Sequence, residues 1–307
     1  MQSVEIIEVG PRDGLQNEAV RFTTEDKLAL IGRLLDAGVR RLEVASFVHP
    51  ERVPQMADAE AVVAGLPDLP DRIYIGLVLN RRGALRALAT REKGRGIDEI
   101  GVVAVASESF AMRNQGQTLM QGIESARDIL RLARREGMRA QVTLSAVFGC
   151  PFEGEVPPDR VREMALAIAE AEPGEIVLAD TIGVAGPGQV EDMISLLREA
   201  LPDMPLRAHF HNTRNTGLAN AWAAFRAGVT RFDASIGGLG GCPFAPAATG
   251  NIATEDLVYM LERSGVGTGL ALRALLTASE WLTARLDRPL ASALGRAGNF
   301  PPQGAAS

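Results

Sequence analysis

Segments with the apolar character of β-strands alternate along the chain with segments whose apolar residues recur at helical spacing. The expected strands cover residues 4–9, 39–48, 73–79, 100–106, 140–148, 176–180, 206–211 and 231–236. The expected helices cover 23–38, about 54–65, 84–92, about 122–137, a stretch after residue 158, about 187–201, 218–228 and 255–264. Eight such pairs, each of about 30 residues, are typical of a closed (β/α)8 barrel, the TIM barrel.

The whole chain fits one such barrel. An open doubly wound sheet is the alternative, but its glycine fingerprint after the first strand is missing. At 307 residues the chain is compatible with one α/β domain, because barrels of this kind commonly exceed ~250 residues. Residues 270–293 are expected to add one or two helices beside the barrel, and residues 299–307 to fray. The sequence therefore predicts a single (β/α)8 domain over residues 1–307 with extra C-terminal helices.

Composition restricts the partners and the location of the chain. Hydrophobic residues make up 46% of it, charged residues 23%, and the net charge is −6. No run of Lys or Arg could follow a phosphate backbone, so no nucleic acid partner is expected. No apolar run reaches the roughly 18 residues of a membrane span, and the first expected strand begins too close to Met1 for a leader peptide. A cytoplasmic protein without a membrane partner is expected.

Two histidines stand one residue apart in the strand expected at 206–211. Alternation along a strand places the side chains of His209 and His211 on one face, about 7 Å apart along the backbone, where two imidazoles can bind one ion. The chain has only 3 His, so this pair is an unusual concentration. The pattern predicts a metal site, and two buried histidines satisfied by hydrogen bonds are the alternative.

Polar residues close several of the expected strands, and in a (β/α)8 barrel the active site lies at those carboxyl ends. They are Arg12 and Asp13 after the first strand, Glu43 and Ser46 in the second, Asp180 and Thr181 at the sixth, and His209 and His211 in the seventh. Because all strands of the barrel are parallel, these side chains are expected at one mouth.

Asp13, His209 and His211 together offer one carboxylate and two imidazole nitrogens. This ligand set suits Mg²⁺, Mn²⁺, Fe²⁺, Co²⁺ or Zn²⁺, and the lack of a thiolate argues against a structural zinc. Asn251 is a candidate neutral fourth ligand, although an Asn in a loop is more often a turn residue.

The eighth strand runs into the glycine-rich segment Gly237–Gly241, followed by Cys242. The segment is either a phosphate cradle made of backbone N–H groups or a mobile flap that carries Cys242 over the site, and simple turn punctuation is the plain alternative. Two cysteines, Cys150 and Cys242, are too few for a disulfide framework, and both lie in Gly-Cys-Pro loops. Cys242 is a candidate reactive thiol or a buried structural one.

Longer motifs cover residues 4–286 and together point to a known family. They are EVGPRDGLQNE at 8–18, SFV at 46–48 with VPQM at 53–56, GCPFEG at 149–154, DTIGV at 180–184, GGLGGCP at 237–243 and GNIATED at 250–256. Through them the chain resembles the hydroxymethylglutaryl-CoA lyases, a family of the metallolyase superfamily of TIM barrels that also contains isopropylmalate and homocitrate synthases. The resemblance implies metal-assisted retro-Claisen cleavage of 3-hydroxy-3-methylglutaryl-CoA to acetyl-CoA and acetoacetate, in leucine breakdown and ketone body formation.

The resemblance also assigns roles to residues whose surrounding motif is present. It implies that Mg²⁺ or Mn²⁺ is the cofactor, with no organic cofactor, and that a CoA thioester is the partner of a homodimeric enzyme. Arg12 is implied to polarise the thioester carbonyl, and Cys242 to be the catalytic thiol. The full set implied is Asp13, His209, His211 and Asn251 as metal ligands, Arg12, Cys242, Asp180 and Glu43 as catalytic residues, and Arg12, Gln16 and Ser46 as substrate-binding residues.

One departure from the family pattern affects the choice of substrate. The chain has Asn212 and Arg214 where these lyases usually have an acid followed by uncharged residues, so the acyl pocket is expected to accept a different group. A lyase for citramalyl-CoA or an isoprenoid-derived glutaryl-CoA is the second hypothesis. A Claisen-condensing acyltransferase and a non-catalytic relic that binds metal and CoA are further alternatives, and the intact motif residues argue against the relic.

Overall fold

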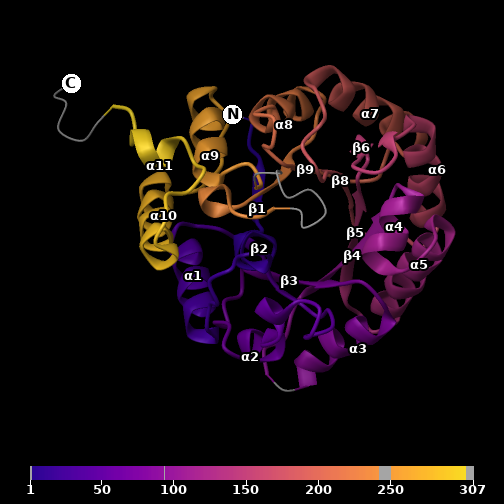
Figure 1. Cartoon of the computed structure of the whole chain (residues 1–307), viewed down its shortest axis with the longest axis horizontal. Helices are drawn as coiled ribbons and strands as arrows, with labels where there is room; N and C mark the ends of the chain where they lie inside the picture. The colour runs from indigo at the N-terminus through magenta and orange to yellow at the C-terminus, as the bar shows by residue number, and fades with distance from the viewer. Residues whose placement is uncertain (1, 93, 242–249, 302–307) are drawn as a thin grey trace.

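A closed barrel of eight parallel strands forms the centre of the computed structural model, within the residues that it describes, which are 2–92, 94–241 and 250–301 (Figure 1). Around the barrel the strands follow the order β1-β10-β9-β8-β5-β4-β3-β2. Their bounds are β1 Glu5–Glu8, β2 Arg41–Ser46, β3 Ile73–Val78, β4 Glu99–Val105, β5 Arg139–Ser145, β8 Ile176–Asp180, β9 Leu206–Phe210 and β10 Arg231–Ala234. The predicted (β/α)8 TIM barrel is confirmed.

Helices surround the barrel, and the C-terminal helices pack at one side of the ring (Figure 1). Those after the strands are α1 Thr24–Asp36, α2 Ala59–Ala64, α3 Arg81–Ala89, α4 Glu108–Gln115, α5 Leu119–Arg135, α6 Pro158–Ala169, α7 Pro187–Ala200, α8 Gly217–Arg226 and α9 Thr254–Arg263. The expected extra helices are α10 Leu272–Leu286 and α11 Leu294–Ala297, and α10 lies against α1 and α9. In the part of the chain that the structure describes, no helix is long and apolar enough to cross a membrane.

Local sequence explains why these segments are helical. The start signal expected before α1 forms a capping box, in which the Asp26 N–H donates to Thr23 Oγ1 at 3.2 Å and the Thr23 N–H donates to Asp26 Oδ2 at 3.1 Å. Of the apolar residues that recur at helical spacing, Ile31 and Leu34 are fully buried. Helix α1 therefore begins and packs as its sequence predicts.

Four features differ from the sequence prediction. Helix α4 was not expected, because only Phe110 and Ala111 among its residues are buried, which leaves no apolar periodicity to detect. The expected helix at 54–65 is a 3-10 turn, Pro54–Met56, followed by α2. The eighth strand ends at Ala234 because residues 236–238 form another 3-10 turn, and Gly149–Cys150 (β6) and Gly154–Glu155 (β7) form a small hairpin outside the barrel.

Charged side chains fill much of the barrel interior, where branched aliphatic layers are usual. Arg41 on β2 binds Glu99 on β4 and Glu175 before β8, and Arg207 on β9 binds Glu175 and Asp233. All five residues are at most 5% exposed. Each buried charge needs its partner because a lone one would pay an uncompensated desolvation cost. The network thus ties strands from opposite sides of the barrel together beneath its carboxyl ends.

Candidate metal centre at the carboxyl ends of the strands

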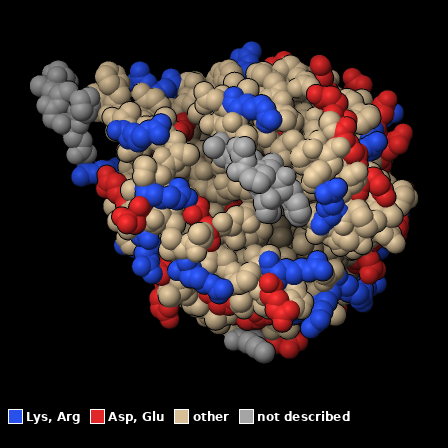
Figure 2. All heavy atoms as spheres, viewed as in Figure 1, with Lys and Arg blue, Asp and Glu red and all other residues tan. Residues whose placement is uncertain are grey.

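A cavity of about 780 Å³ lies at the carboxyl ends of the barrel strands. Its wall includes Arg12, Asp13 and Gln16 after β1, Glu43 on β2, Thr181 after β8, His209 and His211 at β9, and Asp233 on β10. Figure 2 shows a hollow near the centre of the face in view, with Lys, Arg, Asp and Glu side chains around its rim. The strand ends therefore open into one polar cavity, as the sequence predicts for a barrel of this type.

The predicted metal ligands meet in this cavity. One ligand atom from each of Asp13, His209 and His211 lies within 4.8 Å of the others. The two imidazoles come from β9 and the residue just after it, and their ring centroids are 5.3 Å apart. Asp13 lies in a short π-helical turn, Gly10–Gly14 (η1), which directly follows β1. The backbone of this turn is fixed because the Asp13 N–H donates to Val9 O at 2.7 Å.

Electrostatics prepares these groups to bind a cation. Burial would raise the pKa of Asp13, but the Arg12 guanidinium and the two imidazoles lower it to about 2. Burial and the neighbouring His209 lower the pKa of His211 to about 4, so this ring is neutral at pH 7. Burial would likewise lower the pKa of His209, but the hydrogen bond to Asp233 raises it overall. The site thus offers a carboxylate and a neutral imidazole.

Two buried atoms without partners test whether a metal ion fits. Among the described residues, neither His211 Nδ1 nor Asn251 Oδ1 has a hydrogen-bond partner. Asn251 Nδ2 donates to Asp13 Oδ2 at 2.7 Å and to Leu239 O at 2.9 Å, which fixes its amide beside the carboxylate. A carboxylate, two imidazoles and an amide oxygen are ligands that Mg²⁺ or Mn²⁺ accepts. The residues present therefore fit a divalent cation, with Asn251 as the neutral ligand expected from the sequence.

Arg12 lies beside this cluster at the cavity surface. It forms an ion pair with Glu43 on β2 and donates from Nη1 to Asp13 Oδ1 at 2.8 Å, with Gln16 Oε1 at 3.5 Å. Burial would lower the pKa of Arg12, but the two carboxylates raise it, so the guanidinium stays charged. Burial raises the pKa of Glu43. The expected residues Arg12, Glu43 and Gln16 thus line the cavity together.

Asp180 and Ser46 do not line the cavity. The two carboxylate oxygens of Asp180 accept hydrogen bonds from the Val184 N–H at 2.9 Å and the Ala185 N–H at 3.0 Å, which hold the loop after β8. Ser46 is fully buried. The neighbouring Thr181 does line the cavity, where its hydroxyl lies 2.8 Å from Ser145 Oγ. Asp180 therefore has a structural contact in the loop after β8, and its catalytic role stays a prediction.

The expected effect of Asn212 and Arg214 on the acyl pocket is not what their contacts indicate. Arg214 is exposed, and its Nη1 donates to Ile182 O at 3.0 Å and to Gly183 O at 2.9 Å. Asn212 Oδ1 accepts from the Gly217 N–H at 3.0 Å. Neither side chain lines the cavity, because both are engaged by neighbouring loop backbone.

The first two amides of the glycine-rich segment are not available to a phosphate cradle. The Gly237 N–H donates to Glu255 Oε2 at 3.0 Å, and the Gly238 N–H donates to Ser235 O at 2.8 Å. Gly237 has a φ of 68°, a left-handed conformation that glycine adopts at no steric cost. These amides are already bonded within the protein, so they cannot bind a phosphate. Cys242 lies outside the described residues.

Sequence reasoning missed Asp233 and gave no role to Arg207. Parallel pairing places Asp233 on β10 directly beside His209 on β9, and His209 Nδ1 lies 3.1 Å from Asp233 Oδ2. Burial would raise the pKa of Asp233, but Arg207 and His209 lower it. The signal available in the sequence was strand alternation. Asp233 occupies an inward-facing position of the strand RFDA, and a charged side chain there needs an interior partner.

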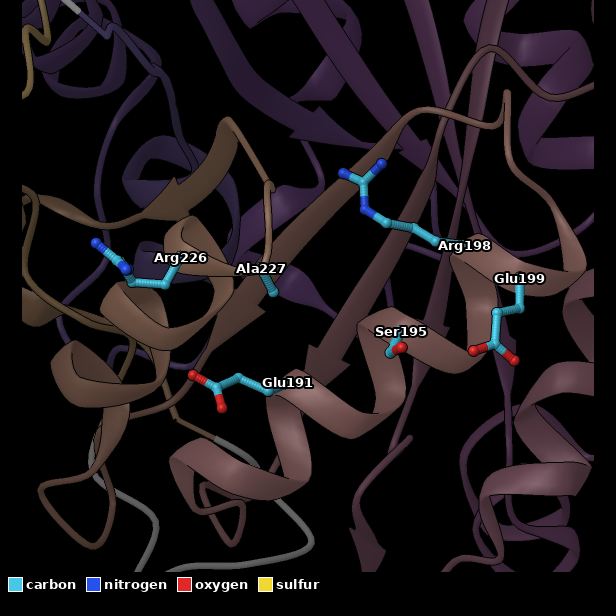
Figure 3. A pocket seen from close by; sticks show the side chains of 6 residues that line it. All are labelled: Glu191, Ser195, Arg198, Glu199, Arg226 and Ala227. Atoms are coloured by element: carbon cyan, nitrogen blue, oxygen red, sulfur yellow. The ribbon is translucent and has the colours of Figure 1, made fainter.

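A second hollow of about 590 Å³ lies on the outer surface between α7 and α8, and Figure 3 shows its lining side chains. They are Glu191, Ser195, Arg198, Glu199, Arg226 and Ala227. All except Ala227 are exposed, and the hollow contains neither imidazole nor thiol among its described lining residues. The candidate functional site is therefore the cavity inside the barrel mouth.

Comparison with known proteins shows the family to which the chain belongs. Residues 3–282 match the model of the HMGL-like family. The chain is 43% identical to an (R)-citramalyl-CoA lyase of Chloroflexus aurantiacus, with 99% of this chain and 97% of that protein covered, and 41% identical to a hydroxymethylglutaryl-CoA lyase of Bacillus subtilis, with 95% and 96% covered. A solved structure of an HMG-CoA lyase from Acinetobacter baumannii in complex with coenzyme A and 3-methylmalate superposes with a TM-score of 0.92 at 38% identity, with 99% of this chain and 98% of that chain covered. The chain is a lyase and belongs to the HMGL-like family.

Proposed function

We propose that this lyase cleaves 3-hydroxy-3-methylglutaryl-CoA to acetyl-CoA and acetoacetate, with Mg²⁺ or Mn²⁺ held by Asp13, His209, His211 and Asn251. The observation that carries the proposal is the buried ligand cluster of the first three residues, next to the Arg12–Glu43 ion pair in one cavity. The lyases at about 40% identity support the reaction class. When bound, a divalent cation supplies Lewis acidity to the oxygens of the substrate.

The residues of the chain then have distinct tasks in the cleavage. The substrate hydroxyl loses its proton to a base, the bond between C2 and C3 breaks, and its electron pair passes to the thioester as an enolate. Arg12 is placed to hold the enolate oxygen, since its charge is maintained by Glu43 and Asp13. A preorganised donor of this kind is worth about 3 kcal/mol of transition-state stabilisation. Gln16 lies beside Arg12 in the cavity wall, and it belongs to the expected set of substrate-binding residues.

A proton must then be delivered to the enolate carbon to release acetyl-CoA. We assign this step to the Cys242 thiol, on the resemblance of GGLGGCP at 237–243 to the family motif. The Gly237–Leu239 part of the segment meets the metal cluster, because Leu239 O accepts from Asn251 Nδ2. The thiol donates its proton to carbon and is reprotonated from solvent once products leave. The base releases the proton of the substrate hydroxyl to solvent, so the enzyme returns to its starting state.

The test is the rate of acetyl-CoA release from 3-hydroxy-3-methylglutaryl-CoA, with Mn²⁺ and after chelation. Metal-dependent cleavage that is lost in Asp13→Ala supports the proposal. His49→Ala is the matched control for metal affinity, because His49 is the third histidine of the chain and lines the cavity outside the ligand cluster. If cleavage is as fast after complete chelation as with Mn²⁺, the assigned metal role is wrong.

(R)-citramalyl-CoA is the second candidate substrate, favoured by the 43% identical lyase. It has one methylene fewer between the carbinol carbon and the free carboxylate, and it yields pyruvate in place of acetoacetate. A single methylene in a pocket changes kcat/KM by roughly 10–200-fold. Coupled assays with lactate dehydrogenase and with 3-hydroxybutyrate dehydrogenase identify the keto acid. If kcat/KM is tenfold higher for (R)-citramalyl-CoA, the first proposal fails and the second replaces it.

Other features of the proposal concern the setting of the enzyme. We infer a cytoplasmic homodimer of single-domain subunits that acts on CoA thioesters in leucine breakdown. Sedimentation velocity tests the dimer, and growth of a deletion strain on leucine tests the pathway. Normal growth on leucine after deletion would exclude an essential role there.

A further inference from the structure

Asp233 is a buried carboxylate whose two oxygens face two different side chains. Oδ2 lies 3.1 Å from His209 Nδ1, and Oδ1 lies 3.3 Å from Arg207 Nε. The exposed fraction is 5% for Asp233 and 2% for Arg207, so water competes little for either contact. The carboxylate is therefore held between the metal cluster on one side and the interior charge network on the other.

Strand register creates this arrangement. Asp233 on β10 and His209 on β9 are direct partners in the parallel pairing, so their side chains leave the sheet on the same face. Arg207 precedes His209 by two residues and faces the interior for the same reason. Strands β8 and β9 lie side by side (Figure 1), and Glu175, just before β8, binds the same Arg207 Nε at 3.2 Å. The guanidinium is thus anchored from a second strand.

We propose that Asp233 is a positioning residue of the metal centre. Arg207 holds the Asp233 carboxylate in place, and this carboxylate fixes the His209 ring with its proton on Nδ1. The inference rests on the metal site of the proposed function. With Nδ1 donating to the carboxylate, Nε2 is the nitrogen that keeps a lone pair for the cation. His211 differs from His209, because its buried Nδ1 has no hydrogen-bond partner among the described residues and is itself available to the cation.

The first test measures Mn²⁺ binding by calorimetry. Asp233→Ala should weaken Mn²⁺ affinity about 10–100-fold, the usual effect of losing such a support. Asp233→Asn keeps the shape and should also weaken it, because an amide N–H can donate to Nδ1 and drive the ring to the other tautomer. Arg231→Met is the matched control, since Arg231 also binds Glu175 and the interior network but not Asp233. Its Mn²⁺ affinity should stay within about twofold of wild type.

The second test observes the tautomer directly in the Mg²⁺-loaded enzyme. With ¹⁵N-labelled histidine the chain gives ring signals from only 3 His, and His49→Ala and His211→Ala assign them. His209 should show a protonated Nδ1 in the wild type, and this signal should be lost in Asp233→Asn. Thermal unfolding establishes that each variant is folded before either measurement.

Several results would overturn the inference. Wild-type Mn²⁺ affinity in Asp233→Ala, or an Nε2 proton on His209 in the loaded wild type, excludes the positioning role. A loss of kcat and of one limb of the pH profile, with Mn²⁺ affinity unchanged, would make Asp233 a group that acts on the substrate. No Mn²⁺ binding by wild type and by His49→Ala alike would overturn the metal site itself, which distinguishes failure of the proposed function from failure of this inference alone.

Discussion

Glu8 is a fully buried carboxylate that joins three segments of the barrel mouth. Its Oε1 accepts hydrogen bonds from the Gly10 N–H at 2.8 Å and the Ile236 N–H at 2.9 Å, and its Oε2 lies 2.6 Å from Thr254 Oγ1. Burial raises the pKa of Glu8 from 4.5 to about 8 in spite of these contacts. We therefore expect Glu8 to be protonated at pH 7 and Glu8→Gln to fold normally, since a glutamine amide can make the same hydrogen bonds.

The sign of the pH effect follows from this raised pKa. The folded state holds the proton up to about pH 8, whereas the unfolded chain releases it near pH 4.5, so the folded state binds more protons between these values. The contribution of Glu8 to the free energy of unfolding of the wild type should therefore be highest below pH 4.5 and fall as pH rises to about 8. Across the whole window the loss amounts to about 5 kcal/mol, as an order of magnitude.

Urea unfolding at pH 5, 7 and 9 measures this effect. Because the side-chain amide introduced by Glu8→Gln does not titrate, the difference in unfolding free energy between variant and wild type should grow in favour of the variant by several kcal/mol from pH 5 to pH 9. Glu25→Gln is the control, as Glu25 is an exposed acid in the first turn of α1. If the Glu8→Gln and wild-type curves stay parallel between pH 5 and pH 9, the reasoning about Glu8 is wrong.

Three further predictions concern the interior network and the site. Arg207→Met should cost about 3–5 kcal/mol of unfolding free energy in urea, because two buried carboxylates each lose one cationic partner, and a cost below 1 kcal/mol would contradict this. Cys242→Ser should lower kcat about 10²–10⁴-fold with Mn²⁺ affinity by calorimetry unchanged, and wild-type turnover would remove its assigned role. Mn²⁺ binding near pH 6 should release protons from His209, whose pKa the hydrogen bond to Asp233 raises against the effect of burial, and not from His211, whose pKa is about 4. Calorimetry in buffers of different ionisation enthalpy counts these protons, and a release of two would show that His211 is charged.

Much of the fold could be predicted from the sequence because the signals are local. Apolar runs located the barrel strands, apolar residues at helical spacing located most of the helices, and the capping box at Thr23 located the start of α1. Where the local signal is weak, prediction failed. Helix α4 has few buried residues, and the two-residue strands of the hairpin β6–β7 are too short to show any period.

The candidate site shows the same division. Strand alternation alone placed His209 and His211 on one side, and the structure brings Asp13 to them. For Asp180 the sequence predicted a catalytic role, and it could not show that the N–H groups of the loop after β8 donate to this carboxylate. The charge of Arg214 was noticed, but sequence could not tell that carbonyls of that loop accept its hydrogen bonds.

By itself the sequence determined the number and order of strands, the side of β9 that carries the imidazoles, and the motifs of the family. Only the tertiary structure decided which groups pair. Closure of the barrel sets β10 beside β1 and β9, and this register gives His209 the neighbour Asp233. A separate backbone bridge pairs Asn251 with His211, and the Asn251 amide donates to Asp13. The physical reason is that alternation depends on each residue and its chain neighbours, whereas a hydrogen bond between strands depends on register, burial and competition among all nearby donors.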